Sequence, residues 1–436
     1  MLRLHDTMTR RPQPVEPLEE GHVRIYTCGP TVYARAHIGN FRAYLFEDVL
    51  RRVLEQRFPR VTHVMNLTDV EDKIIRNAVA NGTGLDEETR PWIEAFFEDL
   101  DALGIRRAHH YPRATAYVEE MVQLIERLQA RGATYQGESG IYFSISSFPD
   151  YGRLSGVRAE GLVAGASGRM DADEYGKEDA RDFALWKNVG PDEIGWDTRL
   201  GRGRPGWHIE CSAMSMSLLG ESFDIHCGGV DNIFPHHENE IAQSEAATGV
   251  PFVRIWCHNE HLRVEGEKMA KSLGNFHTLR DLVEQGARPS AVRYLLGATV
   301  HYRKQLNYTA DEVHASGEAV ERFATLRDRL LALPPRRGEG GPAVLLAERA
   351  TREFDEALDD DLNLPGGMGV VFTALRDANA LLDAGGVDGA GRAALLALVE
   401  HVDDILGVLP LVDRERDAAL TPEVRALLEE RAAVRA

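Results

Sequence analysis

Apolar residues in the first third of the chain alternate between short β-rich runs and longer stripes with helical spacing. Residues 23–28 and 61–67 are compact runs rich in β-branched and apolar side chains, which predict strands. Residues 41–54 repeat apolar side chains along one helical stripe, and residues 72–82 predict a second helix that ends at Gly82. Strand, helix, strand and helix in this order predict a parallel sheet with crossover helices.

The pattern continues with two further helices near 86–102 and 116–131 and a strand at 141–145. Residues 146–206 differ, because they are rich in Gly, Asp and Arg and show little periodicity. We interpret this stretch as an insertion into the α/β domain.

The α/β pattern resumes after the insertion. Residues 222–228 and 252–258 predict strands, and a helix is expected from about Pro235. Beyond residue 278 the chain is expected to be almost entirely helical, interrupted at 333–343 by a Pro- and Gly-rich connector.

These elements predict an α/β fold: a Rossmann-like parallel-sheet catalytic domain with an insertion, followed by an all-α C-terminal region. The expected divisions are a first catalytic half (1–145), the insertion or connective segment (146–206), a second catalytic half (207–277), a helical stem (278–332) and a C-terminal helical domain (344–436).

Composition narrows the class of protein. A chain of 436 residues exceeds one usual hydrophobic core, and 43% hydrophobic with 27% charged residues is typical of a soluble globular protein. Charged residues interrupt every apolar run, which argues against a membrane protein, and the N-terminus lacks the apolar core of a signal peptide, so a cytoplasmic location is expected. The four cysteines are far apart, which favours metal ligands, catalytic thiols or core residues over disulfides.

The net charge of the chain argues against non-specific binding of nucleic acid. The formal net charge is −19, so the molecule as a whole repels phosphate at long range. An RNA partner would therefore need a local basic patch.

Two short motifs have residue types that suit ATP. His37-Ile38-Gly39-Asn40 lies where the first strand leads into the first helix, a junction at which α/β sheets bind ligands and helix N–H groups bind phosphate. Lys268-Met269-Ala270-Lys271-Ser272 resembles a phosphate clamp that neutralises departing pyrophosphate. Taken singly, each motif also fits a plain reading, a helix cap for the first and a solvated basic loop for the second.

A third set of residues has the composition of a zinc site. Cys28 ends the first strand, Cys211 follows the insertion, and His236 and Glu240 are four apart on one helical face. Spacing alone leaves a second interpretation open, in which the cysteines are core residues and the helix simply begins with polar side chains.

The motifs together resemble the cysteinyl-tRNA synthetases, a class I aminoacyl-tRNA synthetase family. The matching segments, in the order of the family, are CGPTVY (28–33), HIGN (37–40), NLTDVEDKIIRNA (66–78), GRPGWHIECSAM (203–214), FDIHCGGVDNIFPHHENEIAQSEA (223–246) and GEKMAKSLGNF (266–276), with HYRKQLNYT (301–309) extending the likeness. The family signatures have His in place of Asn40 and Ser in place of Ala270.

The resemblance implies a function and a site. Cysteine would be activated with ATP and Mg²⁺ and joined to the 3′ end of tRNA(Cys), with neither DNA nor a membrane as partner, and one Zn²⁺ per chain would select the substrate thiol. The residues that match the family's zinc ligands are Cys28, Cys211, His236 and Glu240, and those that match its amino-acid pocket are Thr68, Trp207 and Asp231. Catalytic roles fall to His37, Asn40, Lys268 and Lys271, and Gly39 and Ser272 complete the ATP site.

Four neighbouring residues receive lesser roles. Cys227 and Cys257 are interpreted as core residues, because free cysteine often fills a strand. His208 and His237 adjoin the proposed ligands, and we expect them to line the pocket or support the ligands.

Two alternative functions remain open at this stage. Cysteine ligases of mycothiol biosynthesis resemble this family but join cysteine to an amino-sugar; the chain ends where the family continues into a small anticodon-binding module, and residues 401–436 have eight acidic against five basic residues. A non-catalytic cysteine or zinc sensor is the second alternative, for which Ala270 is the only argument.

Overall fold

A four-stranded parallel sheet lies at the centre of the computed structural model, which describes residues 1–157, 182–269, 274–334 and 336–419. Its strands lie in the order β11-β10-β3-β4, and every neighbouring pair is parallel. The strands are β3 (His22–Thr27), β4 (Arg60–Met65), β10 (Phe223–Gly229) and β11 (Val253–Asn259). Because parallel strands require crossover connections, helices cover both faces of this sheet.

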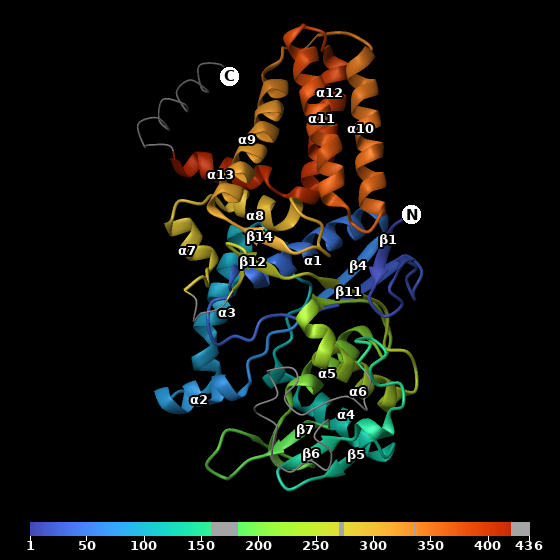
Figure 1. The fold of residues 1–436 in the computed structure, drawn as a ribbon, viewed down its shortest axis with the longest axis vertical. Helices are drawn as coiled ribbons and strands as arrows, with labels where there is room; N and C mark the ends of the chain where they lie inside the picture. The colour runs from blue at the N-terminus through green and yellow to red at the C-terminus, as the bar shows by residue number, and fades with distance from the viewer. Residues whose placement is uncertain (158–181, 270–273, 335, 420–436) are drawn as a thin grey trace.

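Alternating side chains of the strands feed two separate cores. Val23, Ile25 and Ile225 point to the face covered by α1 (Ile38–Arg57). Tyr26 and Val64 point to the opposite face, where three helices pack: α4 (Val118–Ala130), α5 (Trp207–Leu219) and α6 (Glu238–Thr248). Two more helices, α2 (Asp72–Asn81) and α3 (Leu85–Ala102), follow β4 along the side of the domain (Figure 1).

A second, antiparallel sheet lies at the end of the molecule opposite the helical region (Figure 1). Its order is β5-β6-β7-β9-β8. The strands are β5 (Thr134–Gln136), β6 (Gly140–Phe143), β7 (Phe183–Asn188), β8 (Trp196–Thr198) and β9 (Gly201–Pro205). The expected insertion therefore contributes β7, β8 and β9, while β5 and β6 come from before residue 146.

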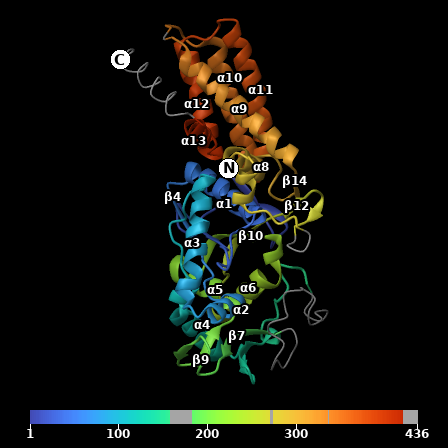
Figure 2. The same ribbon diagram turned by 90° about the vertical axis from the view of Figure 1, so that its left-hand side faces the viewer.

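Helices dominate the chain after residue 278. α9 (Ala310–Ala332), α10 (Gly341–Asp359), α11 (Leu364–Asp383) and α12 (Gly389–Leu406) form the elongated bundle that rises above the sheet in Figures 1 and 2. The shorter helices α7 (Leu279–Glu284), α8 (Pro289–Ala298) and α13 (Leu409–Ala419) lie at its base.

Short strands complete the structure. β1 (Arg3–Asp6) pairs with β2 (Arg11–Pro14), and a small sheet joins β12 (Leu262–Val264), β13 (Glu267–Lys268) and β14 (Leu306–Tyr308). β14 is a departure from the all-helical expectation: Leu306 and Tyr308 are buried against β12, and this packing outweighs local helix preference.

A buried ionic cluster joins α1 to the base of the bundle. Asp48 accepts hydrogen bonds from Arg52 at 2.8 Å and from Arg293 at 2.6 Å. The same arginines donate to main-chain carbonyls near the end of α12, Arg52 to Asp404 at 3.0 Å and Arg293 to Leu406. Two cations at a helix C-terminus complement its dipole, so the cluster fixes the bundle against the helix that begins at the signature motif.

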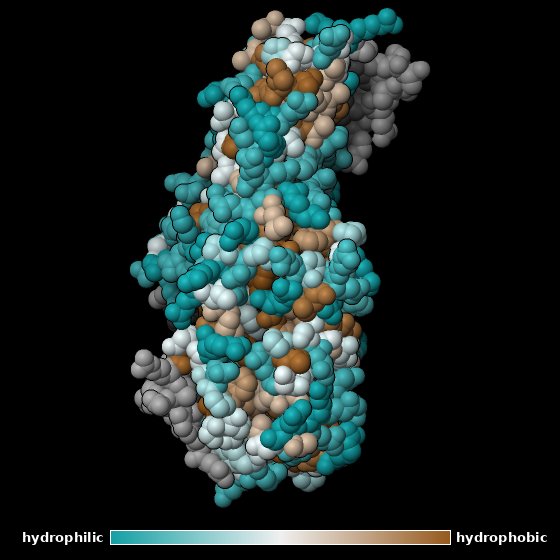
Figure 3. Space-filling model, turned by 90° about the vertical axis from the view of Figure 1, so that its right-hand side faces the viewer, coloured by the Kyte–Doolittle hydropathy of each residue, from teal (hydrophilic) through white to brown (hydrophobic). Residues whose placement is uncertain are grey.

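The structure confirms the fold class and the elements expected from the sequence, with α1 beginning three residues before its predicted start and α6 preceded by an irregular turn at Ile233–His237. No helix of the described residues is both long and apolar enough to cross a bilayer. The face shown in Figure 3 is mainly hydrophilic, with apolar side chains scattered over it.

Candidate active site

One large pocket, of about 1060 Å³, opens at the carboxyl ends of the parallel strands. Its wall includes Cys28 after β3, Asn66 and Thr68 after β4, and Gly228 at the end of β10. This edge of a parallel sheet is the usual ligand site in α/β folds. The start of α1 and the start of α5 complete the wall, so the first signature motif shares one cavity with three of the proposed metal ligands, Cys28, Cys211 and His236.

The first signature motif forms the N-terminus of α1. Asn40 N–H donates to His37 Nδ1 at 3.2 Å, and His37 N–H donates to Asn40 Oδ1 at 3.1 Å, which together make a capping box. Because Nδ1 accepts a hydrogen bond, a neutral His37 has its proton on Nε2. The Asn40 main-chain N–H thus holds the His37 ring, which lines the pocket, while the Asn40 side chain holds the main chain of His37.

Gly39 is required by the close packing of this motif. A Cβ atom at residue 39 would lie 2.9 Å from the His37 ring and 2.9 Å from the terminal methyl of Met269. The two signature motifs therefore meet at Gly39. Lys268 lines the same pocket, whereas Lys271 and Ser272 of the second motif lie outside the described residues.

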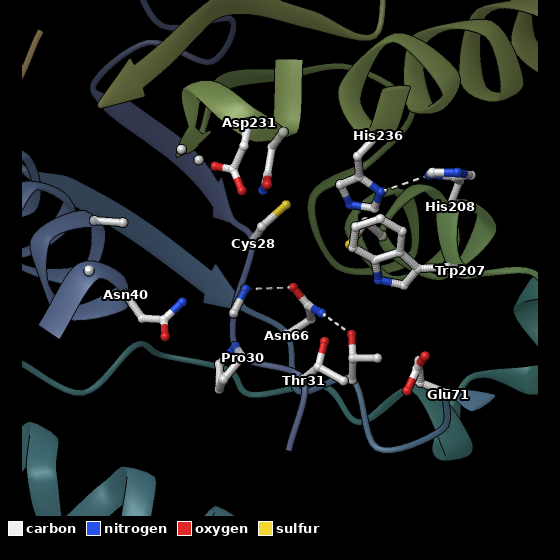
Figure 4. A pocket seen from close by; sticks show the side chains of 18 of the residues that line it. Cys28, Pro30, Thr31, Asn40, Asn66, Glu71, Trp207, His208, Asp231 and His236 are labelled. Atoms are coloured by element: carbon white, nitrogen blue, oxygen red, sulfur yellow. Dashed lines mark hydrogen bonds between the residues drawn. The ribbon is translucent and has the colours of Figure 1, made fainter. Parts of the chain in front are cut away.

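Four potential metal ligands converge beside this pocket. Cys28, Cys211, His236 and Glu240 each offer a donor atom, and these atoms all lie within 4.8 Å of one another. Figure 4 shows Cys28 and His236 facing the same space from different elements. Two sulfurs, an imidazole and a carboxylate are the donor types that zinc prefers.

The state of Glu240 supports a metal at this point. Glu240 is completely buried, and its Oε1 lies 3.1 Å from His236 Nε2 yet has no hydrogen-bond partner. An unpartnered buried carboxylate oxygen is costly unless a cation satisfies it. The donor set therefore fits a zinc ion.

Buried histidines surround the ligands. His226 Nε2 lies 2.9 Å from Glu240 Oε2, and His237 Nε2 lies 3.3 Å from Cys28 Sγ. His258 in turn bonds the other ring nitrogen of His237 at 2.8 Å. His226 and His237 also form a second possible ligand set with Cys28 and Glu240, which overlaps the first.

Burial controls the protonation of these groups in the absence of a cation. A hydrogen bond to Cys211 and burial both raise the pKa of Cys28 well above its usual range. The same hydrogen bond lowers the pKa of Cys211, but burial and the nearby Glu240 carboxylate together outweigh it, and the net pKa is raised. Desolvation lowers the pKa of His237, so that its imidazole is neutral. Metal binding at this site must displace thiol protons.

The three residues expected in the amino-acid pocket all line this cavity. Trp207 begins α5 and stacks on His236, with ring centroids 4.4 Å apart (Figure 4). Asp231 lies on the short 3₁₀ turn Val230–Asn232 after β10. Thr68 lies after β4, and its hydroxyl donates to Glu210 at 3.2 Å.

The remaining cysteines are core residues, as expected. Cys227 and Cys257 are fully buried, occupy paired positions on β10 and β11, and belong to the core on the α1 face. Cys211 belongs to the core on the opposite face. Side chains alternate along β10, so His226 points to that face and reaches Glu240, whereas Cys227 points to the α1 face. His208 lies beside His236, with 3.0 Å between their Nδ1 atoms.

The sequence alone assigns no function to three residues of the site. His226 contacts Glu240, and Asn66 and Glu210 both contact Thr68. Each lies within a motif that carries the family resemblance, but only the folded chain brings them to their partners.

Comparison with known proteins identifies the family. The model of the class I (C) tRNA synthetase catalytic domain matches residues 14–318, and that of the DALR domain matches residues 353–410. A cysteine–tRNA ligase of Protochlamydia amoebophila is 48% identical over 95% of this chain and 87% of its own length. One of Chlamydia pneumoniae is 50% identical over 89% of this chain and 82% of its own length. The chain belongs to the cysteine–tRNA ligase family.

Solved structures extend the likeness of this cysteine–tRNA ligase family member to the class I fold. Methionyl-tRNA synthetase of Mycobacterium tuberculosis, in complex with methionyl-adenylate, has a TM-score of 0.63 at 16% identity and covers 89% of this chain and 90% of its own. A leucyl-tRNA synthetase of Agrobacterium radiobacter, in a ternary complex with tRNA, has a TM-score of 0.65 at 12% identity, covering 91% and 85%. At such low identity these likenesses concern the fold alone.

Proposed function

We propose that this chain activates L-cysteine with ATP and transfers it to the 3′ end of tRNA(Cys), with zinc selecting the substrate thiol. The observation that carries the proposal is the convergence of Cys28, Cys211, His236 and Glu240 beside the pocket that also holds the first signature motif. Membership of the cysteine–tRNA ligase family supports the same reaction.

Cysteine differs from serine by one atom, so selection requires more than a fitted pocket. Apolar pockets separate near-isosteres by only about a hundredfold. When bound, zinc would act as a Lewis acid that prefers a thiolate to a hydroxyl. Cys28, Cys211, His236 and Glu240 would hold it, while His226 and His237 orient Glu240 and Cys28 through the contacts described above.

Activation requires the substrate carboxylate to meet the α-phosphate of ATP. A carboxylate oxygen attacks the α-phosphorus, the bond to the bridging oxygen breaks, and pyrophosphate leaves; Mg²⁺, when bound, would neutralise charge on the phosphates. His37, with its proton on Nε2, would donate to a phosphate oxygen, and the N-terminus of α1 faces the same charge. Lys268 and Lys271 would neutralise the leaving pyrophosphate, and Ser272 would bind beside them.

The second step needs no protein nucleophile. The terminal ribose hydroxyl of tRNA attacks the carbonyl carbon of cysteinyl-adenylate, loses its proton, and AMP leaves. Thr68, Trp207 and Asp231 would keep the aminoacyl group in place during both steps, because all three line the pocket. A cytoplasmic location would suit this reaction.

The experiment that tests the proposal has two stages. Cysteine-dependent exchange between ATP and labelled pyrophosphate tests activation, and incubation with tRNA(Cys) tests transfer. We expect exchange with cysteine, little with serine, and cysteine on the tRNA. Exchange without charging of tRNA would favour the amino-sugar ligase, and a protein that binds cysteine with no exchange would be a sensor.

A further inference from the structure

A chain of buried hydrogen bonds runs along the wall of the amino-acid pocket, from Gly29 after the end of β3 to Glu210 on α5. Gly29 N–H donates to Asn66 Oδ1 at 2.9 Å, and Asn66 Nδ2 donates to Thr68 Oγ1 at 3.1 Å. The Thr68 hydroxyl donates to Glu210 Oε2 at 3.2 Å. The relative exposures of Asn66, Thr68 and Glu210 are only 1%, 2% and 1%, so water does not compete for these bonds.

The direction of the chain is set at its first member. A main-chain N–H can only donate, so Gly29 requires the oxygen of the Asn66 amide, and the NH₂ group of that amide is then turned toward Thr68. Only glycine permits this approach, because a Cβ at residue 29 would lie 1.8 Å from the Asn66 carbonyl oxygen.

The main chain of Thr68 is fixed as well. Its N–H donates to the Pro30 carbonyl and its own carbonyl accepts from Val32 N–H, both at 3.1 Å. Backbone and side chain are therefore both held before any ligand arrives, which is the preorganisation that a selective site requires.

The hydrogen-bond chain leaves the Thr68 hydroxyl able to accept one further hydrogen bond but not to donate one. A threonine hydroxyl has one proton and two acceptor positions. The proton is used on Glu210 and one acceptor position on Asn66, so a single acceptor position remains for the pocket that Thr68 lines. Asp231, a carboxylate, lines the same pocket. Both groups are complementary to a ligand that donates.

We infer that Asn66 and Glu210 are positioning residues that make Thr68 a hydrogen-bond acceptor for the α-ammonium group of the substrate. This inference rests on the proposed function, since it concerns the same amino-acid pocket. It adds a second criterion to selection by the thiol: a ligand must present its ammonium group to Thr68 while its sulfur is held at the proposed zinc site.

The test compares two thiols that each lack one group of cysteine. Cysteamine has the ammonium but no carboxylate, and 3-mercaptopropionate has the carboxylate but no ammonium. Their inhibition constants in cysteine-dependent pyrophosphate exchange are measured for the wild type and for Asn66→Ala, Glu210→Leu and Glu210→Gln. Zinc content and far-UV circular dichroism establish that each variant is folded and loaded.

We expect Asn66→Ala and Glu210→Leu to raise the inhibition constant of cysteamine and the KM for cysteine about tenfold, the usual effect of losing a hydrogen bond to a charged group. The inhibition constant of 3-mercaptopropionate should stay within about twofold of its wild-type value. Glu210→Gln, which keeps an acceptor oxygen, should restore most of the cysteamine affinity. Ser212→Ala is the matched control, because it removes a buried 2.6 Å hydrogen bond from the same helix to Gln243.

Other results overturn the inference. An equal rise in the inhibition constants of both thiols would mean that the hydrogen-bond chain merely supports the shape of the pocket. A loss confined to 3-mercaptopropionate would mean that Glu210 donates to Thr68 and that the hydroxyl faces the substrate carboxylate. Unchanged constants in every variant would remove the chain from recognition altogether. A wild type that shows no exchange with cysteine would instead refute the proposed function itself.

Discussion

The affinity of the four-ligand site for zinc should increase steeply with pH. In the absence of metal, the hydrogen bond to Cys211 and burial raise the pKa of Cys28, and burial with the Glu240 carboxylate raises that of Cys211 against the opposing effect of the same hydrogen bond, so both thiols are protonated near neutral pH. Zinc binds thiolates, so each binding event releases two protons. Below the raised pKa values, the association constant should therefore rise about hundredfold per pH unit, tenfold for each thiol.

Competition with a chromophoric chelator, repeated between about pH 6 and pH 8, measures this slope directly. A Cys211→Ser variant is the control, because it removes one titrating thiol and should reduce the slope to about tenfold per pH unit. A wild-type affinity that does not change with pH, or a slope that Cys211→Ser leaves unaltered, would refute the reasoning, since one or both thiols would then not be zinc ligands.

Two further substitutions probe the signature motif and the junction with the bundle. Gly39→Ala should lower kcat of pyrophosphate exchange about hundredfold, because the added methyl must displace the His37 ring or Met269, and misplacement by an ångström has effects of this size; an unchanged kcat would show that the ring has no part in the step. Asp48→Asn should lower the free energy of unfolding by about 3 kcal/mol in urea denaturation, because it leaves Arg293 buried without its anion. A midpoint equal to that of the wild type would show that this pair adds nothing to stability.

Strong periodicity made most of the fold predictable. The stripe in residues 41–54 gives α1, and the β-rich runs give β3 and β4 within two residues of their observed ends. Residues 201–205, Gly-Arg-Gly-Arg-Pro, form β9 although they have neither alternation nor β-branched side chains. This strand exists because β7 and β8 pair with it on either side, which no local pattern records.

The site was predictable only in part, for a physical reason. Residue spacing places His236 and Glu240 on one face, but Cys28 and Cys211 reach them through tertiary structure, and the family resemblance alone indicated the set. For Asn40, the family resemblance implies a catalytic role and a contact with ATP, and the folded chain adds that its side chain caps α1 by accepting from the His37 main-chain N–H.

X-ray absorption at the zinc edge tests the central claim most directly, because it counts the sulfur atoms around the ion at about 2.3 Å. Without substrate, the spectrum should report two sulfurs, from Cys28 and Cys211. Addition of cysteine should bring a third sulfur into that shell, and addition of serine should leave the count unchanged. A sulfur count that does not rise with cysteine would contradict selection of the substrate by its thiol.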